Sequence, residues 1–220
     1  MIEPPLSEED LLERANALAG RTIGELGRQH RVPIPPDTKR MKGLVGQLME
    51  TALGASAGSL GEPDFMEIGV ELKTLPVLAS GEPKESTFIC TIVLTEMSEI
   101  DFEDSLVWRK LRRMLWMPVQ ADPELPLPQR RVGVPILWSP NDAQRRVLRD
   151  DYERIATLVL KGDIDAVTGH LGTYLQVRPK GADSTVRQRA PGQDGGYQWT
   201  GPRGFYLRPQ LTTQLLAAYR

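Results

Sequence analysis

The chain has 220 residues, of which 40% are hydrophobic and 25% charged, a composition typical of a folded globular domain and unlike that of disordered or fibrous proteins. No apolar run reaches the roughly 18 residues of a membrane-spanning helix, and the first residues do not resemble a signal peptide, so we expect a cytoplasmic protein with no membrane partner. The only cysteine, Cys90, permits neither an intramolecular disulfide nor a thiolate zinc site.

The net charge of −2 hides an uneven distribution along the chain. Residues 1–104 carry 9 Lys/Arg against 19 Asp/Glu, whereas residues 105–220 carry 18 against 10. Acidic side chains suit a divalent metal and basic side chains suit phosphate, so this division favours a nucleic-acid enzyme. Chance clustering of surface charge is the alternative interpretation.

Three helices are expected in the first quarter of the chain. Ser7 precedes three acidic residues and an apolar pattern with helical spacing, which predicts an N-capped helix. Thr22 and Glu25 have the spacing of a capping box and predict the start of a second helix. The proline-rich segment 31–37 is expected to be a loop, and apolar residues at helical spacing predict a third helix over 42–53.

The middle of the chain combines strand and helix patterns. Apolar and charged residues alternate over 68–73, which predicts a strand with Glu71 and Lys73 on one face. The β-branched run 87–94 predicts a central strand. The segment 105–115 is rich in Lys and Arg and predicts a helix with a basic face.

The last third predicts short strands and two helices. A capped helix is expected from Asn141 to about residue 160, and the polar, glycine-rich segment 182–200 is expected to be a mobile loop. The remaining elements are short strands at 132–137, 174–178 and 204–207 and a closing helix at 211–219. Mixed strands and helices without an internal repeat indicate a mixed α/β or α+β domain.

The most informative chemical pattern is Asp64 followed by Glu71 and Lys73. Two carboxylates, one from a turn and one from the adjoining strand, can share a hard divalent cation, and Glu50 from the preceding helix could add a ligand. A lysine on the same strand face can orient a water and stabilise charge that develops on phosphorus. This is the constellation of the PD-(D/E)xK nucleases.

The pattern has competing explanations when it is taken alone. Short Asp…Glu-x-Lys matches arise by chance, and alternating charges on a strand are often only its solvent-exposed face. Other catalytic schemes fit less well, because His30 and His170 have no metal-ligand spacing. The sequence also lacks a Gly-x-Ser-x-Gly, a P-loop and a Gly-x-Gly-x-x-Gly motif.

Several blocks of uncommon residues occur together and in order, over a span from about residue 11 to 216. They are Leu53–Ser59, Asp64-Phe65, Gly69–Thr74, Arg130–Gly133, Leu137–Pro140, Tyr174–Gln176, Arg178–Lys180 and Pro202–Leu207. In this combination the chain resembles the MutH family. The resemblance implies a restriction-endonuclease-like fold, with a central mixed sheet flanked by helices and two lobes around a DNA-binding cleft. The single domain 1–220 would have a catalytic lobe at about 1–104 and a DNA-binding lobe at about 105–220.

The resemblance also implies an activity and its partners. Members of this family nick the unmethylated strand of double-stranded DNA at hemimethylated GATC sites, with Mg²⁺ as cofactor and Mn²⁺ as a possible substitute. MutL activates them after MutS has found a mismatch. We expect a monomer.

Catalytic roles follow from the resemblance position by position. It assigns metal ligation to Asp64 and Glu71, catalysis to Lys73, and supporting roles to Glu50 and Lys42, with Glu50 as a further metal ligand. The first three are also the residues that spacing and chemistry select.

For DNA contact the resemblance indicates Lys110, Arg178, Tyr206 and Phe88, with the two aromatic residues near the adenine whose methylation is tested. Simpler interpretations stay open here. Phe88 and Tyr206 could be core residues, and Lys110 could belong to a solvated helix face.

Some features depart from the family, and two other functions compete with the one that it implies. The loop at 31–36 is unusually rich in proline, and Leu106 and Trp108 replace polar residues. A type II restriction endonuclease that cuts GATC would share the catalytic core. A non-catalytic DNA-binding module of the same fold is the second alternative, against which the intact Asp64, Glu71 and Lys73 argue.

Overall fold

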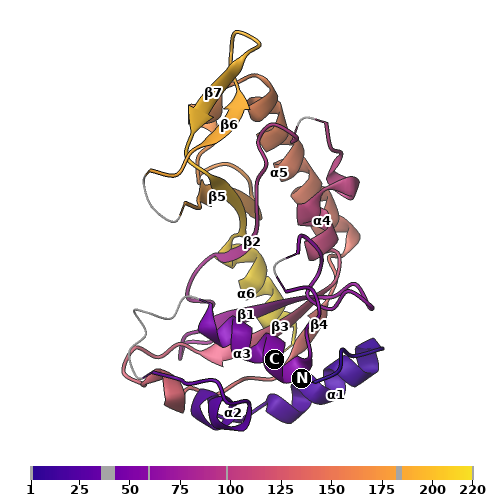
Figure 1. The fold of residues 1–220 in the computed structure, drawn as a ribbon, viewed down its shortest axis with the longest axis vertical. Helices are drawn as coiled ribbons and strands as arrows, with labels where there is room; N and C mark the ends of the chain where they lie inside the picture. The colour runs from indigo at the N-terminus through magenta and orange to yellow at the C-terminus, as the bar shows by residue number, and fades with distance from the viewer. Residues whose placement is uncertain (1, 36–42, 59, 98, 182–184, 220) are drawn as a thin grey trace. The chain divides into compact units, whose positions relative to one another are not determined.

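The computed structural model describes residues 2–35, 43–58, 60–97, 99–181 and 185–219, and the chain divides into two compact units (Figure 1). Unit 1 comprises Met1–Glu85, Arg112–Ser139 and Leu215–Arg220, and unit 2 comprises Ser86–Leu111 and Pro140–Gln214. Both units are discontinuous in sequence, so their limits differ from lobes that meet at residues 104 and 105. The charge imbalance between the two halves of the chain is therefore not an imbalance between compact units.

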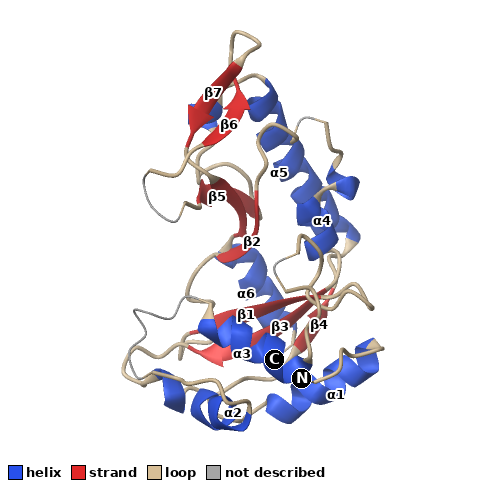
Figure 2. Ribbon diagram, viewed as in Figure 1, coloured by secondary structure: helices blue, strands red, loops and turns tan. Residues whose placement is uncertain are grey.

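Unit 1 is built on a mixed three-stranded sheet (Figure 2). Strand β1 (Glu71–Val77) pairs in parallel with β3 (Met114–Gln120), which pairs antiparallel with β4 (Ile136–Trp138). Successive side chains of a strand point to opposite faces, and the register places Leu72 beside Leu115 on one face and Glu71 beside Met114 on the other. The sheet thus separates an apolar face from a face that carries ionisable groups.

Three helices of unit 1 pack on the apolar face. They are α1 (Glu8–Leu18), α2 (Ile23–Gln29) and α3 (Leu44–Leu53), and their buried leucine, isoleucine and methionine side chains form one core with Leu72 and Leu115. The expected caps are confirmed. The Ser7 hydroxyl accepts a hydrogen bond from the Asp10 amide at 3.1 Å, and Thr22 and Glu25 form a reciprocal capping box.

Unit 2 contains an antiparallel sheet of three strands, in the order β2, β8, β5, and a separate two-stranded hairpin of β6 and β7. The strands are β2 (Thr87–Thr91), β5 (Leu175–Pro179), β6 (Gln188–Pro191), β7 (Tyr197–Thr200) and β8 (Arg203–Leu207). The helices are α4 (Leu106–Leu111), α5 (Asp142–Leu160) and α6 (Pro209–Ala218). Helix α6 belongs to unit 2 as far as Gln214, and its residues from Leu215 onward belong to unit 1. Short 3₁₀ helices lie at Phe102–Asp104 and Ile164–Ala166 in unit 2 and at Leu127–Gln129 in unit 1. The expected mixed fold of helices and strands is confirmed.

Several local predictions were wrong. The strand expected over 87–94 ends at Thr91 and lies at the edge of its sheet, not at its centre. The strand expected over 68–73 begins at Glu71 and continues to Val77, because residues 65–70 form a turn. The helix expected over 105–115 ends at Leu111, since Met114 to Met117 are buried in succession and form strand β3 instead. The segment 182–200 contains the β6–β7 hairpin and is not simply a loop.

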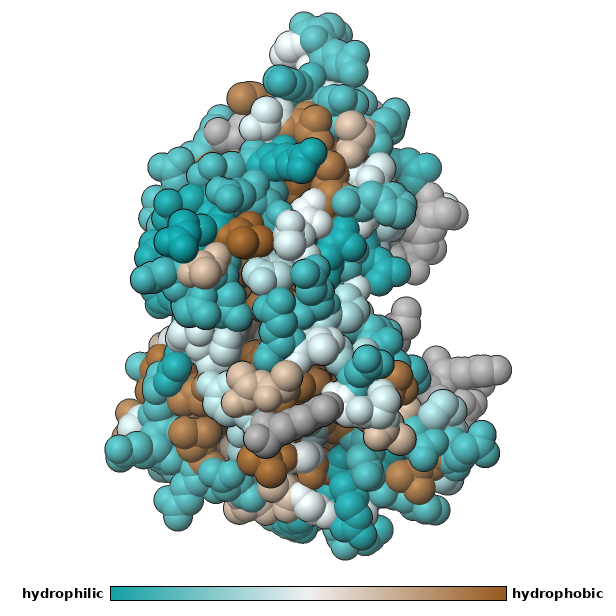
Figure 3. Space-filling view, turned by 180° about the vertical axis from the view of Figure 1, so that it is seen from behind, coloured by the Kyte–Doolittle hydropathy of each residue, from teal (hydrophilic) through white to brown (hydrophobic). Residues whose placement is uncertain are grey.

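The surface is mostly hydrophilic, with scattered apolar residues, on the face drawn in Figure 3. Among the described residues no helix combines the length and hydropathy needed to cross a membrane. Exposed apolar side chains include Val134, which is 70% exposed, and Trp199, which is 71% exposed. Single exposed apolar residues are normal, but an exposed tryptophan suggests a partner.

Tyr152 on α5 makes the stability of unit 2 depend on pH in the alkaline range. The ring contacts Phe102 and Phe205, and the hydroxyl donates to the Ile100 carbonyl at 2.9 Å. Burial raises the pKa of the phenol from 10 to about 12. As the pH rises, the phenol therefore ionises in the unfolded chain before it ionises in the folded chain. The stability that this group contributes is complete below pH 10 and is lost as the pH rises toward 12, by about 2 kcal/mol. We expect the melting temperature of Tyr152→Phe to fall less than that of the parent over this range, and parallel profiles would contradict the assignment.

Candidate active site

Asp64 is brought to strand β1 by a tight chain reversal. The Phe65 amide donates to the Val70 carbonyl at 2.9 Å, and Gly69 supplies the positive φ of 65° that the turn requires. The Asp64 carboxylate consequently lies beside the start of the strand and accepts a hydrogen bond from the Leu72 amide at 2.8 Å. A residue seven positions upstream in sequence is thereby placed next to Glu71.

Glu71 and Lys73 share a strand face, as the alternation predicts, and they form an ion pair through Glu71 Oε1 and Lys73 Nζ. The Lys73 ammonium also donates to the Leu72 carbonyl at 3.2 Å. The Glu71 side chain is 1% exposed and that of Lys73 is 19% exposed. The alternative of a solvent-exposed strand face is therefore wrong, because a buried carboxylate is held next to a partly exposed ammonium.

The surroundings of this pair are apolar. Met114 and Trp116 lie beside Glu71 and Lys73 in the parallel register, and Trp116 packs edge-on against Trp138 with ring centres 6.4 Å apart. Trp116 is fully buried. Charges in such an environment interact more strongly than in water, so the attraction between Glu71 and Lys73 is strengthened.

Glu50 lies in the last turn of α3, a helix that packs against β1, and is half-buried. Within the described ranges no three His, Cys, Asp or Glu side chains are grouped as metal ligands, so Glu50 does not complete such a cluster with Asp64 and Glu71 here. The Asp64 carboxylate instead accepts a hydrogen bond from the Leu72 amide, and the Glu71 carboxylate accepts one from the Lys73 ammonium. Lys42 lies outside the described residues.

The two carboxylates nevertheless fit a magnesium ion by their donor chemistry. Magnesium takes oxygen ligands, keeps several of its waters and is commonly held by one or two carboxylates together with substrate phosphate. The Asp64 carboxylate lies near Glu71 because it accepts a hydrogen bond from the amide of the next residue, Leu72. Together Asp64 and Glu71 provide the two carboxylates. A third protein carboxylate is not required.

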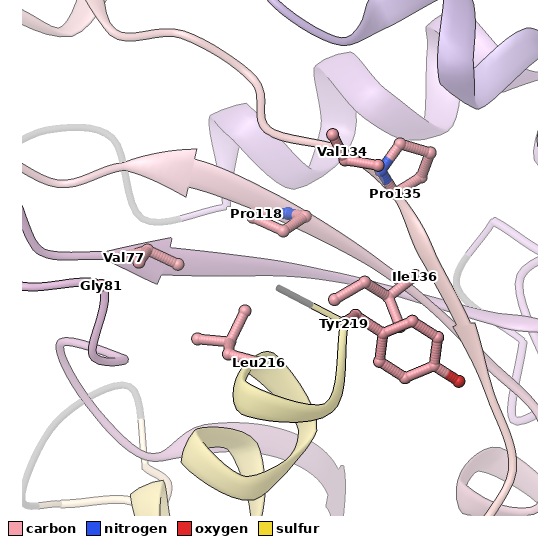
Figure 4. Close-up of a pocket in the computed structure, with 8 residues that line it drawn as sticks. All are labelled: Val77, Gly81, Pro118, Val134, Pro135, Ile136, Leu216 and Tyr219. Carbon is pink, nitrogen blue, oxygen red and sulfur yellow. The ribbon is translucent and has the colours of Figure 1, made fainter.

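A pocket at the other end of the same sheet face has a different character (Figure 4). Its volume is about 240 Å³, and its lining is Val77, Gly81, Pro118, Val134, Pro135, Ile136, Leu216 and Tyr219. Figure 4 shows the Leu216 and Tyr219 side chains from the end of α6 beside the strands. No carboxylate or amine lines this pocket, so it is not the candidate for hydrolytic chemistry.

In unit 2 the structure brings three of the expected DNA-contact residues together. Phe88 on β2 lies opposite Tyr206 on β8, with ring centres 5.3 Å apart and planes at 62°. The Arg178 guanidinium lies 5.6 Å from the Tyr206 ring centre. A cationic group on an aromatic pair is suited to stacking on a base and binding a phosphate.

Two further residues of this cluster were missed from the sequence. Lys180 Nζ lies 4.2 Å from the Phe88 ring centre, and a Cβ on Gly204 would come within 2.8 Å of that ring. Lys180 stands two residues after Arg178, so strand alternation could have found it. The close contact at Gly204 depends on tertiary packing and has no sequence signal.

Lys110 lies on a different element, α4, and is only 8% exposed. The interpretation of a solvated helix face is therefore wrong for this residue. Its expected contact with DNA stays a prediction, because a buried ammonium reaches phosphate only if its surroundings rearrange.

The chain is similar to known DNA mismatch repair proteins. A family model described as "DNA mismatch repair enzyme MutH" matches residues 53–151. The protein named "DNA mismatch repair protein MutH" from Yersinia enterocolitica serotype O:8 is 48% identical over 216 residues, which cover 98% of this chain and 95% of the relative. The proteins of the same name from Yersinia pseudotuberculosis serotype IB and Yersinia pestis strain Pestoides F are each 47% identical with the same coverage. The chain belongs to the MutH family of DNA mismatch repair enzymes.

Membership of the MutH family confirms the resemblance inferred from the ordered sequence blocks. The family model includes Asp64, Glu71 and Lys73 but ends before Arg178 and Tyr206. The full-length relatives cover those later positions as well. Both units therefore belong to the matched region.

Proposed function

We propose that this MutH-family enzyme nicks the unmethylated strand of hemimethylated GATC sites in double-stranded DNA, with Mg²⁺ as cofactor and MutL as activator. The observation that carries the proposal is the arrangement at the start of β1, where Asp64 accepts from the Leu72 amide and Lys73 pairs with the buried Glu71. Carboxylates and an ammonium in one apolar setting are the groups that phosphodiester hydrolysis uses.

Each residue has a distinct task in the proposed reaction. Asp64 and Glu71 would hold the cation, which would neutralise charge on the phosphate and lower the pKa of a bound water when present. Lys73 has three donors, and Glu71 holds its ammonium close to the strand. From there Lys73 orients the attacking water and stabilises the negative charge that grows on the phosphate oxygens.

The Phe88, Tyr206 and Arg178 cluster supports a role in reading the recognition sequence. Aromatic faces make apolar contact with a base or a methyl group, and a guanidinium binds a guanine edge or a phosphate. A methyl group on adenine would change the fit in such a cluster. Lys180, which lies over the Phe88 ring, adds a positive charge to the same surface.

Strand choice is the expected result that tests this function. With Mg²⁺, MutL and ATP, a hemimethylated GATC plasmid should be nicked on the unmethylated strand, and a fully methylated plasmid should resist. Chelation of the metal should stop nicking, and added Mn²⁺ should restore it. A monomer is expected in solution.

The same assay separates the alternatives. A restriction-type enzyme of this fold would cut both strands of the unmethylated site without MutL. A non-catalytic module would bind the duplex and leave it intact. Equal cutting of all three methylation states would rule out the proposed specificity.

A further inference from the structure

The β6–β7 hairpin of unit 2 has one anchored face and one open face. The register pairs Arg189 with Trp199 and Pro191 with Tyr197, so these four residues share a face. On the other face Ala190 is fully buried, and the Gln198 side chain donates to the Gly162 and Pro191 carbonyls at 2.7 and 2.8 Å. The hairpin is thus held by its inner face, and its outer face is left for solvent or a partner.

The outer face carries large aromatic side chains in water. Trp199 is 71% exposed and Tyr197 is 63% exposed. The Arg189 guanidinium lies 3.9 Å from the Tyr197 ring centre, which holds the cation against the hairpin. Exposed aromatic and arginine side chains are the ones that dominate binding energy at interfaces, and neither ring contributes much to the core here.

The charge of the hairpin segment 185–201 indicates the kind of partner that its outer face would bind. Residues 185–201 contain Arg187 and Arg189, and Asp194 is their only acid. The Asp194 carboxylate accepts a hydrogen bond from the Gly196 amide at 3.0 Å and so belongs to the turn. The outer face therefore combines positive charge with flat apolar rings, a combination that complements the phosphates and sugars of a nucleic acid.

We propose that the outer face of the β6–β7 hairpin, formed by Arg187, Arg189, Tyr197 and Trp199, is a second DNA-contact surface that binds the duplex beyond the recognition sequence. The inference rests on the proposed function. The hairpin is inserted between β5 and β8, the strands of Arg178 and Tyr206, and the Lys180 amide donates to the Pro202 carbonyl at its base, at 2.8 Å.

The dimensions of the hairpin are compatible with this role. A two-stranded ribbon fits the major groove of B-DNA. Strands of four residues are about 13 Å long, which is about four base-pair steps of duplex. Because arginine contacts of this kind go mainly to phosphate, the added affinity should not depend on the flanking sequence.

Salt-dependent binding provides the first test. Binding is measured in Ca²⁺ to a duplex with long flanks and to one with only a few base pairs around the site. For the variant with both Arg187→Ala and Arg189→Ala, the magnitude of the salt slope on the long duplex should fall by about two. On the short duplex it should match the parent. Lys84→Ala removes an exposed cation from unit 1 and serves as the control.

Tryptophan fluorescence provides the second test. Trp116 and Trp138 are buried and Trp199 is exposed, so a neutral quencher such as acrylamide reports mainly on Trp199, with a smaller signal from the half-buried Trp108. Long duplex DNA should protect the parent protein from quenching. The variant Trp199→Phe should lose most of the quenching and its dependence on DNA.

The outcomes separate the inference from the proposed function. If the parent binds and nicks DNA while the long duplex leaves its quenching unchanged and the arginine variant keeps the parental salt slope, the inference is overturned and the proposed function stands. The outer face would then be left to a protein partner. If the parent neither binds nor nicks a GATC duplex, the proposed function fails and the inference fails with it.

Discussion

Lys73→Ala is expected to lower the nicking rate by about 10²-fold to 10⁴-fold, the range typical of a single electrostatic or proton-handling group. The reason is that Lys73 is the ammonium that Glu71 holds at the start of β1. Asp64→Ala and Glu71→Ala should abolish nicking, and they should weaken metal binding, which Lys73→Ala should largely spare. Binding to the GATC duplex in Ca²⁺ should survive in Lys73→Ala, since Ca²⁺ fills oxygen sites without the tight octahedral geometry of Mg²⁺.

The burial of Glu71 makes a stability control necessary. Removing Lys73 leaves a carboxylate that is 1% exposed without its ion-pair partner, which can cost several kcal/mol. The double variant Glu71→Gln, Lys73→Met removes both charges together and keeps similar side-chain volumes. Lys84→Ala, an exposed lysine of the same unit, is the matched control. If Lys73→Ala nicks at the parental rate while folded, the proposed catalytic centre is wrong.

Asp151→Ala is expected to destabilise the protein by about 3–5 kcal/mol, the largest effect on stability that we predict. Asp151 lies on α5 and is 6% exposed. Its carboxylate accepts three hydrogen bonds, from the amides of Thr173 and Tyr174 at 2.7 Å and of Leu175 at 2.8 Å. These bonds fix the entry to β5, the strand that carries Arg178. Loss of the acceptor leaves three amide donors without their partner.

The neighbouring residue provides a close comparison. Asp150 is exposed on the same helix, so Asp150→Ala should change stability by less than about 0.5 kcal/mol. Asp151→Asn keeps one acceptor oxygen and should lie between the two variants. For a chain of this length each kcal/mol corresponds to about 2–4 °C in melting temperature. Equal melting temperatures for the Asp150 and Asp151 alanine variants would show that the three hydrogen bonds do not support the fold.

The sequence by itself determined the helix starts at Ser7 and Thr22 and the strand alternation at the candidate site. The caps at Ser7 and Thr22 involve only neighbouring residues and were predictable for that reason. The shared face of Glu71 and Lys73 follows from strand alternation. The ordered blocks of uncommon residues were sufficient to indicate the family, because each block can be recognised without knowledge of its contacts.

Tertiary structure decided what depends on distant partners. The helix expected over 105–115 stops at Leu111 because the residues from Met114 onward pair with β1 as a strand. Their side chains are buried on both faces of the sheet. The charge division between the halves of the chain does not persist in the fold, since unit 2 contains 13 Lys/Arg and 13 Asp/Glu in its two segments. Glu71 is buried rather than solvated, and Lys180 joins Phe88, because segments far apart in sequence meet there. Burial and pairing of this kind are properties of the assembled chain, so no local pattern encodes them.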